Sequence, residues 1–250
     1  MFIGLGTLAN VVTVVVGSAI GLLIGNRFPG RTQATVVDAL GLVTILLGAL
    51  AAVDVLSPAL SAATGDRAPV LVVLGGLLIG GVIGSLLDLE RRFDGFGHWM
   101  RRRLVRGEAT GHPSESRFVN GFVSASLLFC VGPLTVLGSL NEGLGRGPDQ
   151  LLVKALLDGF SSIAFAASLG IGVMASAIVV LVVQGALTFA GWAIGDVLPE
   201  AHLMALSAAG GLILVGLGLR LLDAKKVPVA NLLPALVVAP LLVQLVLLLR

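Results

Sequence analysis

Long apolar stretches, each with no more than one charged residue, constrain this chain more than any other feature of its sequence. A helix needs about 20 apolar residues to cross the hydrocarbon core of a bilayer, since that core is about 30 Å thick and each residue rises about 1.5 Å. Charged residues make up 12% of the chain, against about 25% in a soluble domain. We therefore expect an all-α membrane protein rather than a soluble enzyme, a disordered chain or a nucleic-acid-binding protein. The candidate spans are 1–25, 33–53, 69–87, 118–141, 155–195, 202–219 and 229–249.

The stretch 155–195 is too long for one span and has about the right length for two. The sequence LGIG at 169–172 predicts a tight turn that divides it, which brings the expected number of transmembrane helices to about eight. This division also places Lys225 and Lys226 on the same side of the membrane as the other strongly basic loops.

Basic residues gather in alternate loops of the eight-span arrangement. The positive-inside rule assigns these loops to the cytoplasmic side, which places both termini outside. The opposite loops hold mostly acidic residues, Glu142 among them. The basic residues of the cytoplasmic loops are Arg27, Arg31, Arg91, Arg92, Arg101, Arg102, Arg103, Arg106, Arg117, Lys225 and Lys226.

The one sizeable loop, at about 89–116, begins with a segment that combines aromatic and basic residues. If this segment is helical, its apolar residues share one broad face. Such an amphipathic helix would lie in the interface of the anionic inner leaflet. A plain basic loop that only sets the orientation is the alternative. The residues of the apolar face are Phe93, Phe96, Trp99, Met100 and Leu104.

Three pieces of the first half of the chain recur in the same order in the second half. Residues 71–81 match residues 181–191 at six of eleven positions, and Asp38 and Asp158 are each the sole acid of their span. The spacing of Gly6 and Gly17 recurs at Gly121 and Gly132. A unit of three spans is odd in number, so its second copy enters the membrane from the opposite side, as in the inverted repeats of many secondary transporters. We expect a single polytopic domain with a first repeat at about 1–90, the loop at about 89–116, a second repeat at about 117–200 and two further helices at about 201–250.

The two acids inside the spans need an explanation, because a charge at the centre of a bilayer costs about 3 kcal/mol. Lys154 precedes Asp158 by four residues and therefore lies on the same helix face. One interpretation is an ion pair near the outer interface, with Lys154 extending outward. The other is an ion or proton site in which Lys154 partly replaces the cation. For Asp38, which lies close to the inner interface, the two interpretations are open in the same way.

Uncharged polar residues accompany these acids. Oxygen ligands suit a hard cation such as Na⁺, and a buried carboxyl group suits a proton. Pro133 interrupts its span after Gly132 and frees backbone carbonyls, which is typical of transporter sites. Small-residue packing and back-bonding to helix carbonyls are the alternative roles. The candidate transport or ion-binding residues are Asp158, Lys154, Ser161, Ser162, Ser124, Ser126, Asn10 and Asp38.

The chain lacks the patterns of enzymes and cofactor proteins. Its three histidines are scattered, its single cysteine excludes a thiolate metal cluster, and it has no Walker motif. We expect no enzyme activity, no cofactor and no metal site. The expected partners are the lipid bilayer and a small ion or solute, with Na⁺ or H⁺ coupling, and no nucleic acid; glycine-rich helix faces leave a homo-oligomer open.

Two segments and a short motif near the end resemble the bacterial DUF554 family of multi-pass membrane proteins. They are FVSASLLFCVGPLTVLGS at 122–139, KALLDGFSSIAFAASLGIGV at 154–173 and NLLPA at 231–235. The resemblance covers essentially the whole chain. It implies a bacterial cytoplasmic (inner) membrane as the location and transport as the expected role, with no substrate attached.

We therefore expect a secondary transporter or channel-like permease that moves a small ion or solute across the bacterial cytoplasmic membrane. Asp158 would be its cation- or proton-binding carboxylate. The alternative is a non-transporting membrane scaffold or assembly protein that uses the glycine-rich helix faces.

Overall fold

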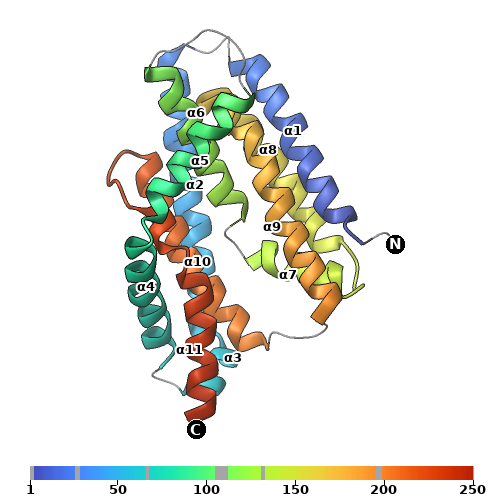
Figure 1. The fold of residues 1–250 in the computed structure, drawn as a ribbon, viewed down its shortest axis with the longest axis vertical. Coiled ribbons are helices and arrows are strands. Elements are labelled where there is room, and N and C mark those ends of the chain that lie inside the picture. Colours follow the sequence, from blue (N-terminus) through green and yellow to red (C-terminus); the bar gives the residue numbers. More distant parts are fainter. Residues whose placement is uncertain are drawn as a thin grey trace. The chain divides into compact units, whose positions relative to one another are not determined.

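Helices make up all the regular secondary structure in the described part of the chain (Figure 1). The computed structural model describes residues 3–25, 29–65, 68–104, 112–130, 133–194 and 199–249. The expected all-α fold is confirmed. The helices are α1 (Leu5–Gly25), α2 (Gly30–Ala52), α3 (Pro58–Thr64), α4 (Pro69–Leu86), α5 (Leu89–Leu104), α6 (His112–Cys130), α7 (Pro133–Gly143), α8 (Asp149–Leu169), α9 (Gly172–Ile194), α10 (Glu200–Leu221) and α11 (Ala235–Leu249), with 3-10 turns η1 (Val53–Leu56) and η2 (Val229–Leu232).

Seven segments within the described ranges are long and apolar enough to cross a membrane, and the α6–α7 pair brings the number to eight if it is one span. The predicted division of the longest apolar stretch is confirmed. Helix α8 ends at Leu169, α9 begins at Gly172, and Gly170 between them has a φ of +81°. Glycine adopts this left-handed conformation without the steric cost that other residues incur, which explains the tight turn.

The span predicted at 118–141 consists of two helices at an angle of 72°. Helix α6 ends at Cys130 and α7 begins at Pro133, where proline is favoured because the first residues of a helix need no N–H donor. The Thr135 hydroxyl donates to the Phe129 carbonyl oxygen at 3.0 Å, which satisfies a carbonyl near the interruption. The interruption expected at Pro133 is confirmed, whereas residues 131–132 lie outside the described part.

The chain divides into two compact units, and each draws on both halves of the sequence. Unit 1 contains residues 1–40, 92–130 and 134–196, and unit 2 contains residues 41–91, 131–133 and 197–250. These units cross the boundaries expected for the two repeats. The inverted repeat stays a prediction.

In unit 1, α1 packs along α8, and both lie beside α9 (Figure 1). Gly6 faces Leu151 near the start of the two helices, and Gly25 faces Ala167 near their ends, so α1 and α8 are parallel. A Cβ atom at Gly17 would lie 2.3 Å from the Gly159 carbonyl oxygen. Only glycine permits this close backbone approach.

The bent pair α6–α7 follows α9 along its length within unit 1. Gly172, at the start of α9, faces Phe118 of α6, whereas Gly191, near its end, faces Leu140 of α7. The pair therefore runs parallel to α9. Helix α9 itself is antiparallel to α8, because the turn at Gly170 joins them, and hence also to α1.

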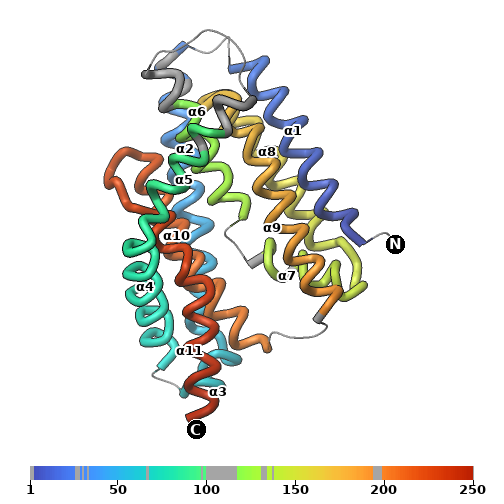
Figure 2. Tube along the Cα trace, in the orientation of Figure 1, coloured from blue at the N-terminus to red at the C-terminus, as the bar shows by residue number. Residues whose placement is uncertain are grey.

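Unit 2 is built on the contacts of α10 and α11 with each other and with α4. Gly48, in the C-terminal half of α2, faces Gly211 of α10. Gly76 faces Ala239 and Gly84 faces Asn231, so α4 and α11 are antiparallel neighbours (Figure 2). Glu90, at the start of α5, accepts hydrogen bonds from the Arg220 side chain and from the Ala230 amide. Small residues and one short helix fill the core, which includes Leu60, Ala205, Ala208, Ala209, Ala239 and Val243.

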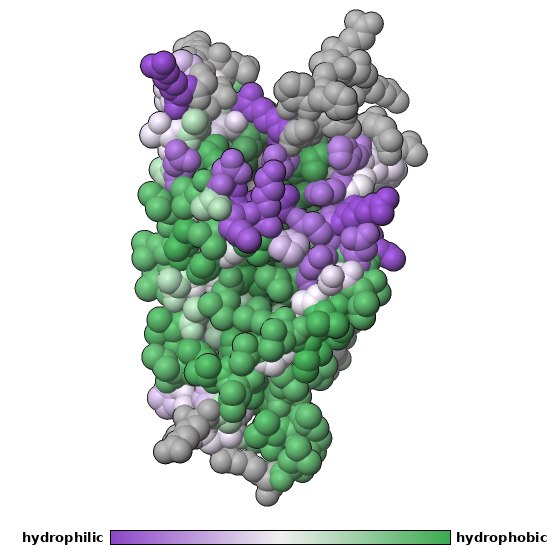
Figure 3. Space-filling model, turned by 90° about the vertical axis from the view of Figure 1, so that its left-hand side faces the viewer, coloured by the Kyte–Doolittle hydropathy of each residue, from purple (hydrophilic) through white to green (hydrophobic). Residues whose placement is uncertain are grey.

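Large apolar side chains are exposed along the candidate spans, as lipid-facing helices require. Figure 3 shows a continuous hydrophobic surface in the lower part of the face it presents, where α4 and α11 lie, and hydrophilic residues gathered above it. Leu71 and Val82 of α4 and Leu241 of α11 are each about 60% exposed. This surface explains the high hydropathy of a chain with a modest internal core.

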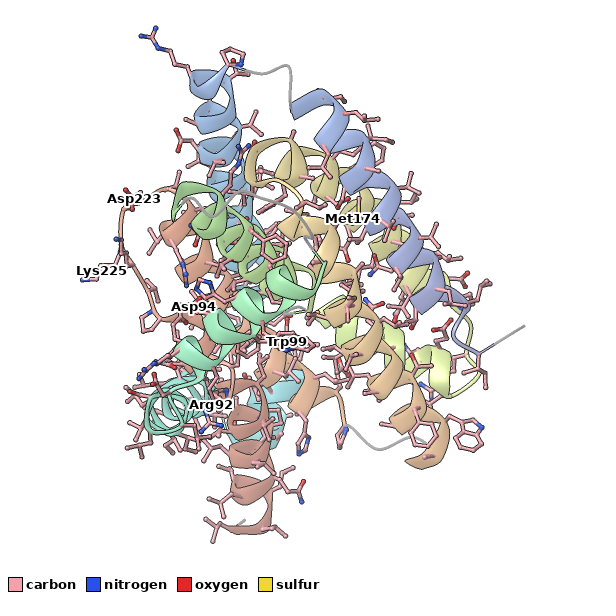
Figure 4. The ribbon with its side chains drawn as sticks, turned by 45° about the horizontal axis from the view of Figure 1, so that its top comes forward. Arg92, Asp94, Trp99, Met174, Asp223 and Lys225 are labelled. Carbon is pink, nitrogen blue, oxygen red and sulfur yellow. The ribbon has the colours of Figure 1, made fainter. Side chains whose placement is uncertain are left out.

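The segment predicted as an amphipathic helix is helical, because α5 covers Leu89–Leu104. The Phe96 ring stacks on the Trp99 ring with centroids 5.5 Å apart, and both side chains are more than 40% exposed. Figure 4 shows Arg92, Asp94 and Trp99 along this helix. The helical part of the prediction is confirmed, while the position of α5 in a lipid interface stays a prediction.

Candidate functional site

A buried ion pair on α8 forms the centre of the candidate site in unit 1. The Lys154 ammonium donates to Asp158 Oδ2, and the two residues are 6% and 7% exposed. The four-residue spacing places both on one helix face, as predicted. Of the two interpretations of this pair, the one in which Lys154 extends outward does not fit, since its side chain is buried and its ammonium is bound to Asp158. The pair as a whole is neutral, which lowers the cost of burying either charge.

Asn10 of α1 completes the set around Asp158. Its Nδ2 donates to Asp158 Oδ2 at 2.9 Å, across the close-packed contact of α1 and α8. Its Oδ1 is buried and has no hydrogen-bond partner among the described residues. Both bonds to Asp158 use Oδ2, so neither occupies its second oxygen. The structure thus brings together Asn10, Lys154 and Asp158.

The predicted serines lie in different settings. Ser162 is buried and its hydroxyl donates to the Gly159 carbonyl at 2.8 Å, so the back-bonding interpretation holds for this residue. Ser161 is only half-buried. Ser124 and Ser126 are buried on α6, and the Ser126 hydroxyl has no partner within the described ranges.

Asp38 differs from Asp158 in its surroundings. It lies near the start of α2 and is exposed, whereas Asp158 is buried against α1. The two acids predicted to be repeat counterparts therefore have unlike environments. The structure does not bring Asp38 into the group formed by Asn10, Lys154 and Asp158.

Gln184 of α9 lies at the level of Asn10. The hydroxyls of Thr7 and Thr188 are 3.4 Å apart, which fixes the register of α1 against α9. Because these helices are antiparallel, one turn onward from Thr7 and one turn back from Thr188 lead to Asn10 and Gln184. The Gln184 side chain is fully buried, and neither of its amide atoms has a partner in the described part of the chain. A buried amide of this kind costs about 1–3 kcal/mol unless a polar group meets it.

Glu142 is a buried carboxylate that sequence analysis assigned to an outer loop. It is 3% exposed, accepts a hydrogen bond from the Gly6 amide at 2.5 Å and another from the Thr7 hydroxyl at 3.3 Å. One sequence signal could have revealed it. Glu142 directly follows a charge-free stretch that contains Gly132-Pro133, so its position at the end of an apolar span is visible in the sequence.

This arrangement suits a proton or a monovalent cation better than a multivalent metal ion. Among the described residues, no group of three or more histidine, cysteine, aspartate and glutamate side chains could hold a metal ion. The site provides the Lys154 ammonium on one oxygen of Asp158. The facing helices add the amide of Asn10 and the hydroxyls of Thr7 and Thr188. A cation can compete with such an ammonium, and a proton can neutralise the carboxylate.

Comparisons with known proteins find one family model and two relatives that match nearly the whole chain. Residues 5–244 match the family model described as "Protein of unknown function (DUF554)". The "Uncharacterized protein YqgA" of Escherichia coli (strain K12) is 33% identical over 239 residues, with 94% of each chain covered. The "Uncharacterized membrane protein YdfK" of Bacillus subtilis (strain 168) is 29% identical over 238 residues, with 95% of each chain covered. No solved structure matches the chain.

Proposed function

The chain belongs to the DUF554 family, and from this premise we propose that it is a secondary transporter or channel-like permease for a small ion or solute in the bacterial cytoplasmic membrane. The buried Lys154–Asp158 pair, with Asn10 bound to the same carboxylate, is the observation on which the proposal rests. Asp158 is the cation- or proton-binding carboxylate. An arriving cation displaces the Lys154 ammonium from Asp158, whereas an arriving proton neutralises the carboxylate and breaks the ion pair.

The setting of the pair supports this role. Intramembrane charges are costly and mark transport pathways in many membrane proteins. Unpartnered polar atoms of Asn10, Gln184 and Ser126 lie on three helices of unit 1, and α6–α7 is interrupted, as binding-site helices of transporters often are. A polar pathway through unit 1 accounts for all of these features together.

The helix directions in unit 1 support eight crossings. Two helices that cross in the same direction must have an odd number of crossings between them. Helices α2 and α4 supply two crossings, so the parallel packing of α1 and α8 requires a third. Among the described residues between α1 and α8, the α6–α7 pair is the remaining candidate. With eight crossings both termini lie on one side, and the basic loops make that side extracytoplasmic.

The scaffold alternative depends on glycine-rich faces that remain available to a partner. Several of these faces are already used within the chain, since Gly17 meets α8 and Gly80 meets α11 at backbone contact. This favours transport over assembly. Binding of a second copy through other surfaces stays a prediction.

We expect Asp158→Asn to reduce ion-dependent flux on the order of tenfold, equivalent to about 1.4 kcal/mol. Asparagine retains an oxygen that can accept from Lys154 and Asn10, but it cannot carry a proton or a negative charge. The measurement is uptake of protons and of radioactive sodium by vesicles of phosphatidylethanolamine and phosphatidylglycerol that contain the purified protein. Asp149→Asn, an exposed acid in the first turn of the same helix, is the matched control.

The result distinguishes the two functions. If Asp158→Asn transports both ions as well as the wild type does, Asp158 has no coupling role. If the wild type moves neither ion nor any tested solute, and co-purifies with another membrane protein, the scaffold function replaces the proposal.

A further inference from the structure

We propose that Glu142 is a second proton-binding carboxylate, which lies on the outer half of the pathway and is coupled to Asp158. The inference rests on the proposed function and adds both a site and a chemical class, the proton. It comes from the burial of Glu142, from the hydrogen bonds it accepts and from its position along the two helices that also hold the Asp158 group.

Glu142 is buried, and its hydrogen-bond donors in the described part of the chain are uncharged groups of α1. Within the described ranges no side chain forms a salt bridge with it, and its hydrogen bonds come from the Gly6 amide and the Thr7 hydroxyl. A buried carboxylate of this kind is stabilised by hydrogen bonds and by the partial positive charge at the start of α1. Protonation is the other way to remove the charge of a buried carboxylate.

The charged groups around Glu142 are few. Helices α1 and α9 contain no Asp, Glu, Lys or Arg, and Glu142 is the only such residue of α7. Helix α8 contributes Asp149, which is exposed, and the Lys154–Asp158 pair, while Arg146 on the α7–α8 link is exposed. The other buried charged groups of these helices are therefore those of the pair, and we expect the protonation of one carboxyl group to influence the other.

Glu142 lies between the water-exposed α7–α8 link and the Asp158 group. Gly145 and Arg146 of that link are exposed, and Glu142 precedes them by three and four residues. On α1, the Thr7 hydroxyl donates to Glu142. Asn10, which lies one turn further along α1, donates to Asp158. Along α1, the Glu142 contact therefore lies nearer the predicted outer surface, and the Asp158 contact lies one turn further toward the membrane interior.

The surrounding groups favour a proton over a metal cation. The Thr7 hydroxyl faces both Glu142 Oε2 and the Thr188 hydroxyl, and either threonine can donate in the second contact. Hydroxyls that both donate and accept can pass a proton along. Two carboxylate and two hydroxyl oxygens fall short of the six or more oxygen ligands of a typical calcium site. The same threonines line a groove of about 420 Å³ between α1 and α9.

The first test measures protonation without transport. Infrared difference spectra of the reconstituted protein, recorded between acidic and alkaline buffer, should contain a carboxyl C=O band that disappears in Glu142→Gln. The band should remain in the Asp149→Asn control, and its pH midpoint should move in Asp158→Asn. An unchanged band in Glu142→Gln overturns the proposal, as does a band whose midpoint ignores Asp158→Asn.

The second test measures proton uptake by vesicles of phosphatidylethanolamine and phosphatidylglycerol that contain the dye pyranine, with an imposed membrane potential. We expect Glu142→Gln to reduce uptake on the order of tenfold, although its amide oxygen still accepts from Gly6 and so retains the structural contact. Thr188→Val, which removes the second hydroxyl, should reduce it less. Circular dichroism and gel filtration check that each variant is folded.

The outcomes separate this proposal from the proposed function. If Asp158→Asn loses proton uptake and Glu142→Gln keeps it, the role of Glu142 is wrong and the transport function stands. If Glu142→Gln loses only sodium uptake, Glu142 belongs to a sodium site and the proposal is wrong. If the wild type moves no ion but the infrared band titrates and responds to Asp158→Asn, Glu142 is a coupled proton site and the transport function fails.

Discussion

At the scale of the residue, the contact that matters most joins Asn10, Lys154 and Asp158. Two opposite charges buried side by side lose much of their hydration, and the ion pair with its added amide donor offsets that loss. Such a pair adds little net stability compared with apolar residues of similar size. Its presence inside a membrane protein is therefore better explained by function than by stability.

The small net stability of the ion pair leads to a prediction for substitutions of its two residues. Lys154→Met alone leaves a buried carboxylate without its cation and should destabilise the protein by about 3–5 kcal/mol. Lys154→Met combined with Asp158→Leu removes both charges and should recover most of that loss. Thermal unfolding midpoints in detergent provide the measurement.

The same double variant separates stability from activity. It should fold well and yet show no ion-dependent flux in vesicles. Wild-type flux in the double variant would show that the pair is only a structural element.

At the scale of the element, close contacts of glycine with backbone decide how the helices pair. Gly17 and Gly21 of α1 each bring a backbone carbonyl of α8 to within 2.3 Å of where a Cβ atom would lie. On α4, a Cβ atom at Gly80 would lie 2.4 Å from the Ala235 amide nitrogen, and one at Gly84 would lie 2.0 Å from the Asn231 carbonyl oxygen. Lipid tails are as apolar as leucine, so close packing of this kind has to drive helix association in a bilayer.

Two glycine substitutions test this point. Gly17→Ala places a methyl group 2.2 Å from the Ser162 hydroxyl and 2.3 Å from the Gly159 carbonyl oxygen, so α1 and α8 must separate, at a cost of about 1–3 kcal/mol. Gly185→Ala, on α9, meets nothing within 4 Å and should stabilise the helix by up to about 1 kcal/mol. The comparison uses unfolding midpoints of the two variants in the same detergent. Equal midpoints would contradict the packing argument.

At the scale of the whole molecule, the number of crossings is the property with the widest consequences. The parallel packing of α1 and α8 favours eight, with the bent α6–α7 pair as the fourth. If that pair instead returned to the side it entered from, the links before α6 and after α7 would lie on the same side. The two arrangements thus differ in the sidedness of known exposed residues.

Cysteine labelling in intact cells distinguishes them. In a Cys130→Ser background, Arg146→Cys should react with a membrane-impermeant maleimide added outside. Arg92→Cys on α5 and Lys225→Cys on the link after α10, both exposed (Figure 4), should react only after the cells are permeabilised. Labelling of Arg92→Cys and Arg146→Cys from one side would contradict eight crossings.

The sequence alone determined where the candidate spans lie, because in lipid each helix must satisfy its own backbone hydrogen bonds and expose apolar side chains. Those demands act on each helix separately. They account for the spans, for the turn at Gly170 and for the interruption at Pro133. The sequence alone also determined the Lys154–Asp158 pair, since a spacing of four residues on one helix brings the two side chains together.

The tertiary structure decided which helices meet, and with them the rest of the site. Asn10 reaches Asp158 from 148 positions away, and Gly6 reaches Glu142 from 136. Such contacts depend on the pairing of α1 with α7 and α8, on which composition and local periodicity carry no information. For this reason the sequence identified Asp158 but placed Glu142 in a loop, and it matched Asp38 with Asp158 although only one of them is buried. Burial depends on the neighbouring helix, and only the folded chain supplies that neighbour.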